Sequence, residues 1–88
     1  MALRHHHEIL LHPYVTEKTL ILMEKENKLE FVVKKDATKP DIKRAFEERY
    51  DVKIESVATK HMQDGKHAII KFAEGYMAED VGMRIGIF

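Results

Sequence analysis

The 88-residue sequence lacks cysteine, so disulfide bonds, thiolate catalysis and thiolate metal sites are excluded. It also lacks an apolar run long enough to cross a membrane and the hydrophobic segment of a signal peptide. Excess charge is absent too, because 15 basic residues balance 15 acidic residues. The apolar content of 44% and the charged content of 34% are typical of a globular protein. We therefore expect one cytoplasmic domain over residues 1–88, with residues 1–8 as a flexible tail.

Residue types that carry out catalysis are also scarce. Ser56 is the only serine, and it lies within a predicted strand without the glycine-flanked turn that exposes a nucleophile. Gly65 is the only glycine before residue 75, so the sequence has no glycine-rich phosphate loop. His5, His6 and His7 could bind a metal ion, but no carboxylate or thiol at ligand spacing accompanies them. We expect neither enzymatic activity, nor a metal site, nor a cofactor.

Hydrophobic periodicity predicts the regular elements. We expect helices over residues 16–25, 38–50 and 78–85 and strands over residues 28–34, 52–59 and 66–72, with a strand over residues 8–11 as a candidate addition. The Asp64-Gly65 pair is a hairpin signal between the last two strands. An antiparallel hairpin and helices that share one core indicate an α+β fold. We expect a small α/β/α sandwich, mainly an antiparallel sheet with helices packed on it and a hairpin extension.

Two of these helices begin with capping residues. Thr16 is a natural N-cap, and Glu17 in the first turn lies at the positive end of the helix dipole. Thr38 and Asp41 fit a capping box. Glu17 and Lys18 are therefore expected at a fixed helix start, directed away from the apolar residues. The motif alone favours the simpler interpretation that this is an ordinary helix start.

Three sets of apolar side chains are expected in the core. They are Leu20, Ile21 and Met23 of the first helix, Leu29, Phe31 and Val33 of the first strand, and Ile42, Ala45, Phe46 and Tyr50 of the second helix. Because a strand alternates, Glu30, Val32 and Lys34 are expected on its outward face. The strand over residues 52–59 breaks strict alternation, which indicates either a bulge or partial cover on both sheet faces.

Basic residues concentrate in two places despite the zero net charge. Between residues 34 and 44, five basic residues stand against two acidic ones. The corner cluster comprises Lys34, Lys35, Lys39 and Lys43, and the hairpin cluster comprises Lys60, His61, Gln63, Lys66 and His67. Lysines that neutralise phosphates gain affinity by releasing counterions, and a hairpin tip can reach into an RNA groove or stack on a base. Ordinary solubilising charge explains the same pattern about equally well.

A series of short motifs resembles one protein family. In chain order the motifs are Val15-Thr16-Glu17-Lys18, Met23-Glu24-Lys25-Glu26-Asn27, Lys35-Asp36-Ala37-Thr38-Lys39-Pro40-Asp41-Ile42-Lys43, Tyr50-Asp51-Val52, the Asp64-Gly65 hairpin and Met83-Arg84-Ile85-Gly86-Ile87-Phe88. Each motif is weak alone, but their order and spacing together are specific. From about Leu11 to Phe88 the sequence resembles the large-subunit ribosomal protein L23 family. The short hairpin and the ending resemble its archaeal branch.

This resemblance implies a structural protein bound to large-subunit rRNA beside the exit of the nascent-chain tunnel, among neighbouring ribosomal proteins. Glu17 matches the family glutamate that helps to dock signal recognition particle or, in bacteria, the chaperone trigger factor. Thr16 and Lys18 match positions close to RNA, and the hairpin from Lys60 to His67 matches an extension that enters rRNA. Ala58 departs from the family pattern, which usually has asparagine at this position.

The residues leave a second function open. Acidic residues gather at positions 47–55 and 74–80, so the molecule can have an acidic face as well as a basic one. A protein-binding module could use that acidic face, or a sheet edge, without contacting RNA. Retention on a polyanion column at low salt would favour RNA binding over this alternative.

Overall fold

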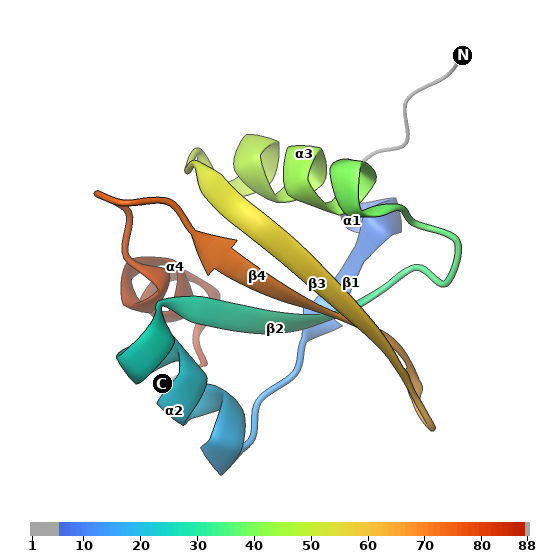
Figure 1. The fold of residues 1–88 in the computed structure, drawn as a ribbon, viewed down its shortest axis with the longest axis horizontal. Helices are drawn as coiled ribbons and strands as arrows, with labels where there is room; N and C mark the ends of the chain where they lie inside the picture. Colours follow the sequence, from blue (N-terminus) through green and yellow to red (C-terminus); the bar gives the residue numbers. More distant parts are fainter. Residues whose placement is uncertain (1–5, 88) are drawn as a thin grey trace.

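The computed structural model describes residues 6–87 and shows helices packed on one sheet (Figure 1). In chain order the elements are α1 (His6–Ile9), β1 (Leu10–Pro13), α2 (Glu17–Glu26), β2 (Lys28–Val33), α3 (Lys39–Tyr50), β3 (Ile54–Met62), β4 (Gly65–Phe72) and α4 (Ala78–Ile85). The predicted α+β class is confirmed, because the helices accompany a four-stranded antiparallel sheet.

The sheet has the order β1-β2-β4-β3, and each neighbouring pair is antiparallel. Strands β3 and β4 form a long hairpin, whose tip extends at the lower right of Figure 1. Ile54 pairs with Phe72 and Ser56 pairs with Lys71, so Glu55 is an extra residue in β3. This register shift confirms the bulge as the reason for the broken alternation.

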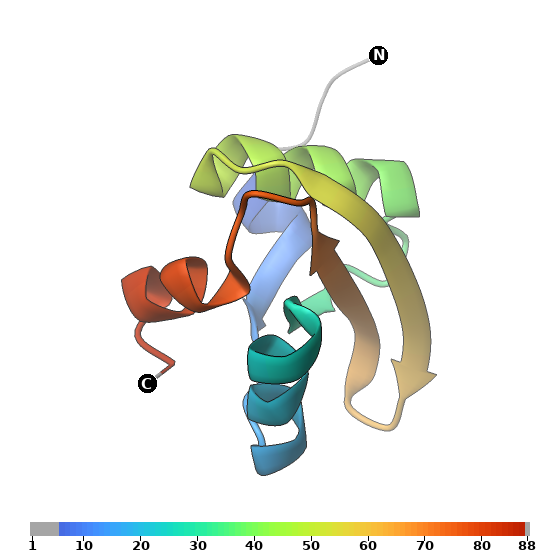
Figure 2. The same ribbon diagram turned by 60° about the vertical axis from the view of Figure 1, so that its left-hand side comes forward.

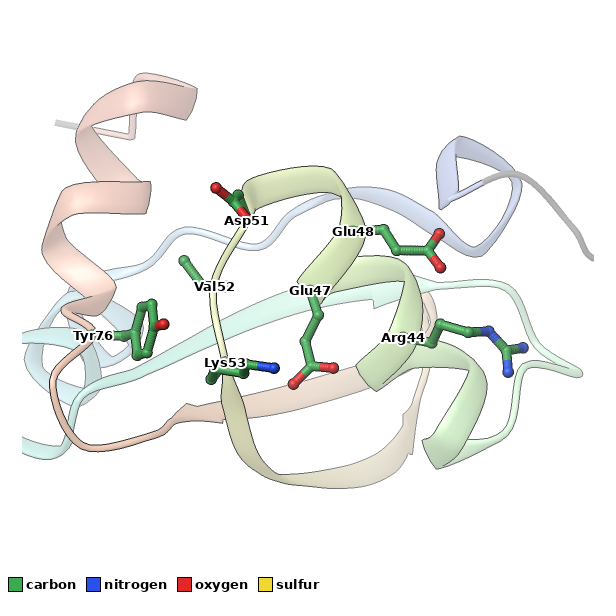
Figure 3. Close-up of a pocket in the computed structure, with 7 residues that line it drawn as sticks. All are labelled: Arg44, Glu47, Glu48, Asp51, Val52, Lys53 and Tyr76. Carbon is green, nitrogen blue, oxygen red and sulfur yellow. The ribbon is translucent and has the colours of Figure 1, made fainter.

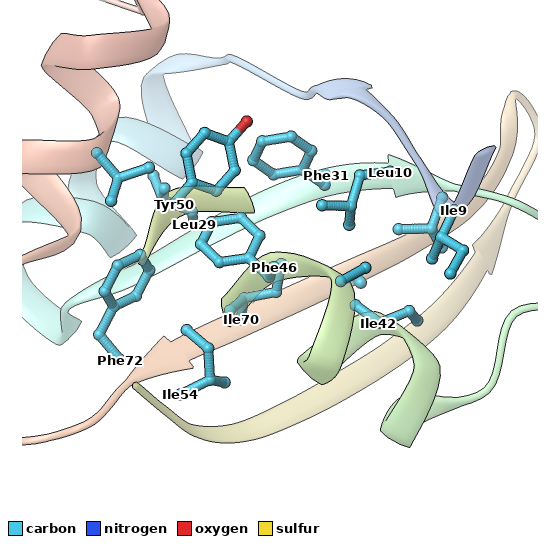
Figure 4. Packing of buried hydrophobic residues seen from close by; sticks show 14 of the residues in the cluster. Ile9, Leu10, Leu29, Phe31, Ile42, Phe46, Tyr50, Ile54, Ile70 and Phe72 are labelled. Atoms are coloured by element: carbon cyan, nitrogen blue, oxygen red, sulfur yellow. The ribbon is translucent and has the colours of Figure 1, made fainter. Parts of the chain in front are cut away.

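One face of the sheet shares a single hydrophobic cluster with the helices (Figure 4). The ring of Phe46 on α3 meets the ring of Phe31 on β2 at 5.3 Å and that of Phe72 on β4 at 5.5 Å, both in edge-to-face geometry. The stripe predicted for α3 is buried throughout: Ile42, Ala45, Phe46 and Tyr50. The other helices add Ile9, Met23, Ala78 and Val81. Since every helix packs into this cluster, the loops and helix ends that emerge from it have fixed positions.

The predicted helix boundaries are confirmed by their capping bonds. The Thr19 N–H donates to Oγ1 of Thr16 at 3.2 Å, and the Thr16 N–H donates to Oγ1 of Thr19 at 2.7 Å. Thr38 and Asp41 form the same reciprocal pair, at 3.0 and 3.2 Å. Each pair satisfies two backbone donors that a helix start leaves without partners.

Asn27 joins the end of α2 to the start of α4. It takes the left-handed conformation, with φ of 58°, and ends α2. Its side-chain Nδ2 donates to the carbonyl of Tyr76 at 2.8 Å, and its Oδ1 accepts from the Ala78 N–H at 2.6 Å. Met77, the residue at the N-cap of α4, offers no side-chain bond. Asn27 thus supplies the capping bond that α4 lacks locally.

The N-terminal part and α2 differ from expectation. The first strand covers residues 10–13 instead of 8–11, and residues 6–8 belong to α1 instead of a tail. Residues 1–5 and 88 lie outside the described residues. Ile21, expected in the core, is 50% exposed. Four consecutive apolar residues, 20–23, cannot all face one side of a helix, and the packing selects Met23 for burial.

The second face of β2 is also covered, which the sequence did not indicate. Glu30 and Val32 were expected to face outward, but both are buried. The Tyr14 N–H donates to the carbonyl of Glu30 at 2.9 Å, which continues the pairing of β1 with β2 beyond Pro13. The Tyr14 ring also meets the ring of His67 at 4.5 Å. The expectation of an exposed second face is therefore wrong for β2.

Candidate nucleic-acid interface

The hairpin tip is narrow and exposed. Met62 pairs with Gly65, so Gln63 and Asp64 form the turn, one residue earlier than the sequence signal suggested. Gly65 has φ of 132°, a conformation that side chains disfavour. His61 and Gln63 are both exposed, as the predicted contact with a ligand requires.

A groove of about 460 Å³ lies between this tip and the chain that follows β2. Its lining residues are Leu11, Val32, Val33, Lys35, His61, Met62, Gln63, Asp64, Gly65 and Lys66. The fold therefore brings Lys35 of the corner cluster together with most of the hairpin cluster. Leu11 and Met62 add exposed apolar surface, with exposed fractions of 49% and 38%. Sequence reasoning missed these two residues, because single exposed apolar side chains carry no periodic signal.

Lys66 links two of the segments that surround the groove. Its Nζ donates to the carbonyl of Ala37 at 2.6 Å, and the side chain is partly buried. This bond ties β4 to the loop that carries Lys35. Lys66 therefore shapes the groove and also places a positive charge at its wall.

Two of the remaining corner lysines lie on α3. Lys39 and Lys43 line a second groove of about 320 Å³, together with Pro40 and Val57. Both lysines and Lys34, which follows β2, are exposed, and the described residues provide no ion-pair partner for any of the three. The corner cluster is thus divided, with Lys35 in the hairpin groove, Lys39 and Lys43 on the side of α3 that faces β3, and Lys34 in neither groove.

His67 does not belong to the exposed surface. The side chain is fully buried, with its Nδ1 2.7 Å from Oε2 of Glu30 and its Nε2 2.8 Å from Oδ1 of Asp64. The prediction that His67 contacts RNA is therefore wrong, because Glu30, Asp64 and the Tyr14 ring enclose it. Alternation on β4 alone did not indicate this burial, since it depends on a segment more than fifty residues earlier.

Each ring nitrogen of His67 lies within 2.8 Å of a carboxylate oxygen, Nδ1 beside Glu30 and Nε2 beside Asp64. The hydrogen bond with His67 lowers the pKa of Asp64 below its usual value. Lys60, with Nζ 3.6 Å from Oε2 of Glu30, places a positive charge beside the buried carboxylate.

The start of α2 lies at the same end of the molecule as the hairpin tip, at the bottom of Figures 1 and 2. The reciprocal capping pair fixes Thr16, whose side chain is partly buried. Glu17 and Lys18 follow it and are both exposed. Tyr14, just before them, contacts His67, so the segment that leads into α2 packs on the hairpin close to its turn.

A further hollow of about 360 Å³ is lined mainly by charged residues at the end of α3 and just after it (Figure 3). Arg44 and Glu48 point away from Lys53 and Tyr76. The Glu47 carboxylate accepts a hydrogen bond from the Ile54 N–H at 2.9 Å, which joins α3 to the start of β3. Among the described residues, no three metal-ligating side chains come together. His5 and the side chains of His6 and His7 lie outside that description.

No helix in residues 6–87 has both the length and the apolar content that a membrane span needs.

Comparisons with known proteins agree on one family. The family model described as "Ribosomal protein L23" matches residues 8–80. The "Large ribosomal subunit protein uL23" of Methanobrevibacter smithii is 48% identical over 83 residues, which cover 93% of this chain and 96% of the relative. The proteins of the same name from Picrophilus torridus and Thermoplasma acidophilum are 46% and 44% identical over 81 residues. These alignments cover 92% of this chain and 99% and 96% of the two relatives.

Proposed function

Because the chain belongs to the ribosomal protein L23 family, we propose that it binds large-subunit rRNA beside the nascent-chain tunnel exit and takes part there in docking a nascent-chain factor. Membership of this family makes it a ribosomal protein of the cytoplasm and not an enzyme. The RNA would be held by the hairpin groove and the corner lysines. Glu17 would belong to the protein-docking site.

The hairpin groove is the observation that carries the RNA-binding proposal. Lys35, His61 and Gln63 come from two segments more than twenty residues apart, and the fold places them around one hollow. The exposed Lys35 and the other side-chain donors in this hollow suit phosphate and base edges, while Leu11 and Met62 provide apolar surface for a base. A role in solubility alone would not require these polar side chains to surround one groove with apolar lining.

The docking proposal rests on the exposed start of α2. The described residues provide no ion-pair partner for Glu17, and the reciprocal threonine cap fixes the direction of the first turn. A carboxylate fixed in this way can pair with a basic side chain of a signal recognition particle or chaperone subunit. Thr16 and Lys18 would lie close to RNA on the same helix start.

Titration with a fragment of large-subunit rRNA at several salt concentrations tests the RNA-binding proposal. The variant Lys35→Ala/Lys43→Ala removes two exposed lysines without breaking a described bond. We expect weaker binding at every salt concentration and a salt slope smaller by about 2, because each lost phosphate contact lowers it by about 0.9. Lys25→Ala/Lys53→Ala is the matched control, since both lysines are exposed and neither lines the hairpin groove or the groove beside α3.

An unchanged salt slope in the Lys35→Ala/Lys43→Ala variant would contradict the RNA-binding proposal. The alternative function, a protein-binding module that does not contact RNA, predicts that outcome together with no retention of the native chain on a polyanion column. Lys60→Ala/Lys66→Ala is a second variant with the same expected loss. Its folding has to be checked by circular dichroism, because Lys66 also bonds to Ala37.

A further inference from the structure

A groove of about 330 Å³ runs between α2 and α4, away from the hairpin groove. Its walls are Leu20, Met23 and Glu24 from α2 and Glu79 from α4. The floor is therefore apolar, and one carboxylate stands on each side. Neither the RNA-binding surface nor the helix start at Glu17 uses these residues.

An exposed apolar side chain extends the groove along α4. Met83 lies one turn after Glu79 and is 62% exposed. Residues four apart share one face of a helix, so Glu79 and Met83 present a continuous edge. Apolar surface in this arrangement suits the apolar stripe of a partner helix.

The charge around the groove is negative and not neutralised within the described residues, which contain no ion pair to Glu24 or Glu79. The nearest basic residue in the α2 sequence is Lys25, which a helix places about 100° around its axis from Glu24. Two unpaired carboxylates would repel the phosphates of RNA and attract basic side chains. The chemistry of the groove thus selects a basic peptide over a nucleic acid.

We propose that the groove between α2 and α4 binds a basic amphipathic helix of a protein partner, with the apolar stripe on Leu20, Met23 and Met83 and flanking basic residues on Glu24 and Glu79. This deepens the docking role proposed above, since it gives the partner a second contact on α2. It differs from the Glu17 contact because its affinity comes from apolar burial as well as charge.

Methyl resonances of the methionines give a direct test in the full 88-residue chain. Met23 lies in the groove and Met83 extends it, whereas Met62 lines the hairpin groove. The probe is an 18-residue amidated peptide of leucine, alanine and arginine, with leucine on one helical stripe and arginine on both borders. We expect it to shift the Met23 and Met83 methyl signals and leave Met62 unchanged. A peptide with glutamate in place of every arginine should bind at least tenfold more weakly.

Charge reversal completes the test. Glu24→Lys/Glu79→Lys should weaken the arginine peptide at least tenfold, and Glu48→Lys/Glu74→Lys, with the same change in net charge, should not. Met83→Gln is a second variant that changes no charge and should weaken binding several-fold.

Equal binding of the two peptides, or an unchanged affinity in the Glu24→Lys/Glu79→Lys variant, would overturn the proposal. Shifts of Met23 and Met83 on adding the rRNA fragment would overturn it too, whereas absence of RNA-induced shifts at Met62 would contradict only the RNA-binding proposal.

Discussion

Nδ1 of His67 lies 2.7 Å from Oε2 of Glu30, and the two side chains are 0% and 2% exposed. This pair joins the middle of β2 to β4 close to the turn of the hairpin. Water does not reach either side chain to stabilise a charge there, so the stabilisation has to come from the other member of the pair. The orientation of the hairpin tip, and with it the proposed RNA contact, rests on a buried pair that itself touches no ligand.

The first prediction concerns the stability that this pair provides. His67→Phe leaves the Glu30 carboxylate buried, with Lys60 at 3.6 Å as its remaining described partner. We expect a loss of about 3–5 kcal/mol in the free energy of unfolding, as for other broken buried pairs. Urea denaturation followed by circular dichroism measures it. The double variant Glu30→Leu/His67→Phe should recover much of the loss, and a double variant with additive losses would argue against a coupled pair.

The second prediction concerns the stability of the fold at acidic pH. The hydrogen bond with His67 lowers the pKa of Asp64 in the folded protein relative to the unfolded chain. A carboxyl group with a lowered folded-state pKa stabilises the fold above its usual value of about 4, and this contribution is lost as the pH falls through the lower folded-state value. Asp64→Asn should therefore reduce stability near neutral pH and make the decline below about pH 4 shallower.

Urea denaturation between pH 2 and 7 measures the acid effect, with Asp51→Asn as a control for an exposed aspartate outside the hairpin. If Asp64→Asn and the native chain lose stability in parallel below pH 4, the bond between Asp64 and His67 does not contribute in solution.

The third prediction separates two roles of Asn27. Its left-handed backbone and its two side-chain bonds both contribute to the junction of α2 and α4. Asn27→Gly keeps the backbone but removes the side chain, and should cost about 1–2 kcal/mol, as for a lost helix cap. Asn27→Ala should cost about 1 kcal/mol more, because alanine disfavours positive φ. Thermal unfolding of both variants measures the difference, and equal costs would show that the backbone conformation is not strained.

Local rules predicted the parts of the fold that local chemistry determines. Thr38 with Asp41, the α3 stripe ending at Tyr50, and Gly86 at the end of α4 each follow from residues within one or two turns. The burial of Glu30 and His67 could not be predicted in this way, because it depends on the pairing of β2 with β4 and on the Tyr14 ring, which is distant in sequence and packs on His67. Asn27 likewise contacts residues about fifty positions later, to which no periodic pattern points.

The same distinction applies to the candidate site. Basic composition identified Lys35, His61 and Gln63, but their position around one groove follows from the sheet order and from the bond between Lys66 and Ala37. His67 was included because it is basic and adjacent to the others in sequence. Its neighbours in space are acidic, and this reverses its role from ligand contact to support.

The last prediction concerns Glu17. An exposed glutamate at a capped helix start stabilises the fold little, so Glu17→Ala should leave unfolding and rRNA affinity unchanged. It should weaken the binding of purified signal recognition particle to large subunits that carry the variant by about fivefold, with a smaller effect at high salt, because an exposed ion pair is screened. Glu48→Ala on α3 is the matched control, since it also removes an exposed carboxylate, from a different helix.

Comparison of Glu17→Ala with Glu24→Lys/Glu79→Lys then separates the two parts of the docking surface. Loss of binding only in Glu17→Ala would limit docking to the helix start, and loss in both would extend it over the α2–α4 groove. Unchanged binding in Glu17→Ala at low salt would show that the capped start of α2 is a structural feature alone. The simpler interpretation that the sequence motif favoured would then hold.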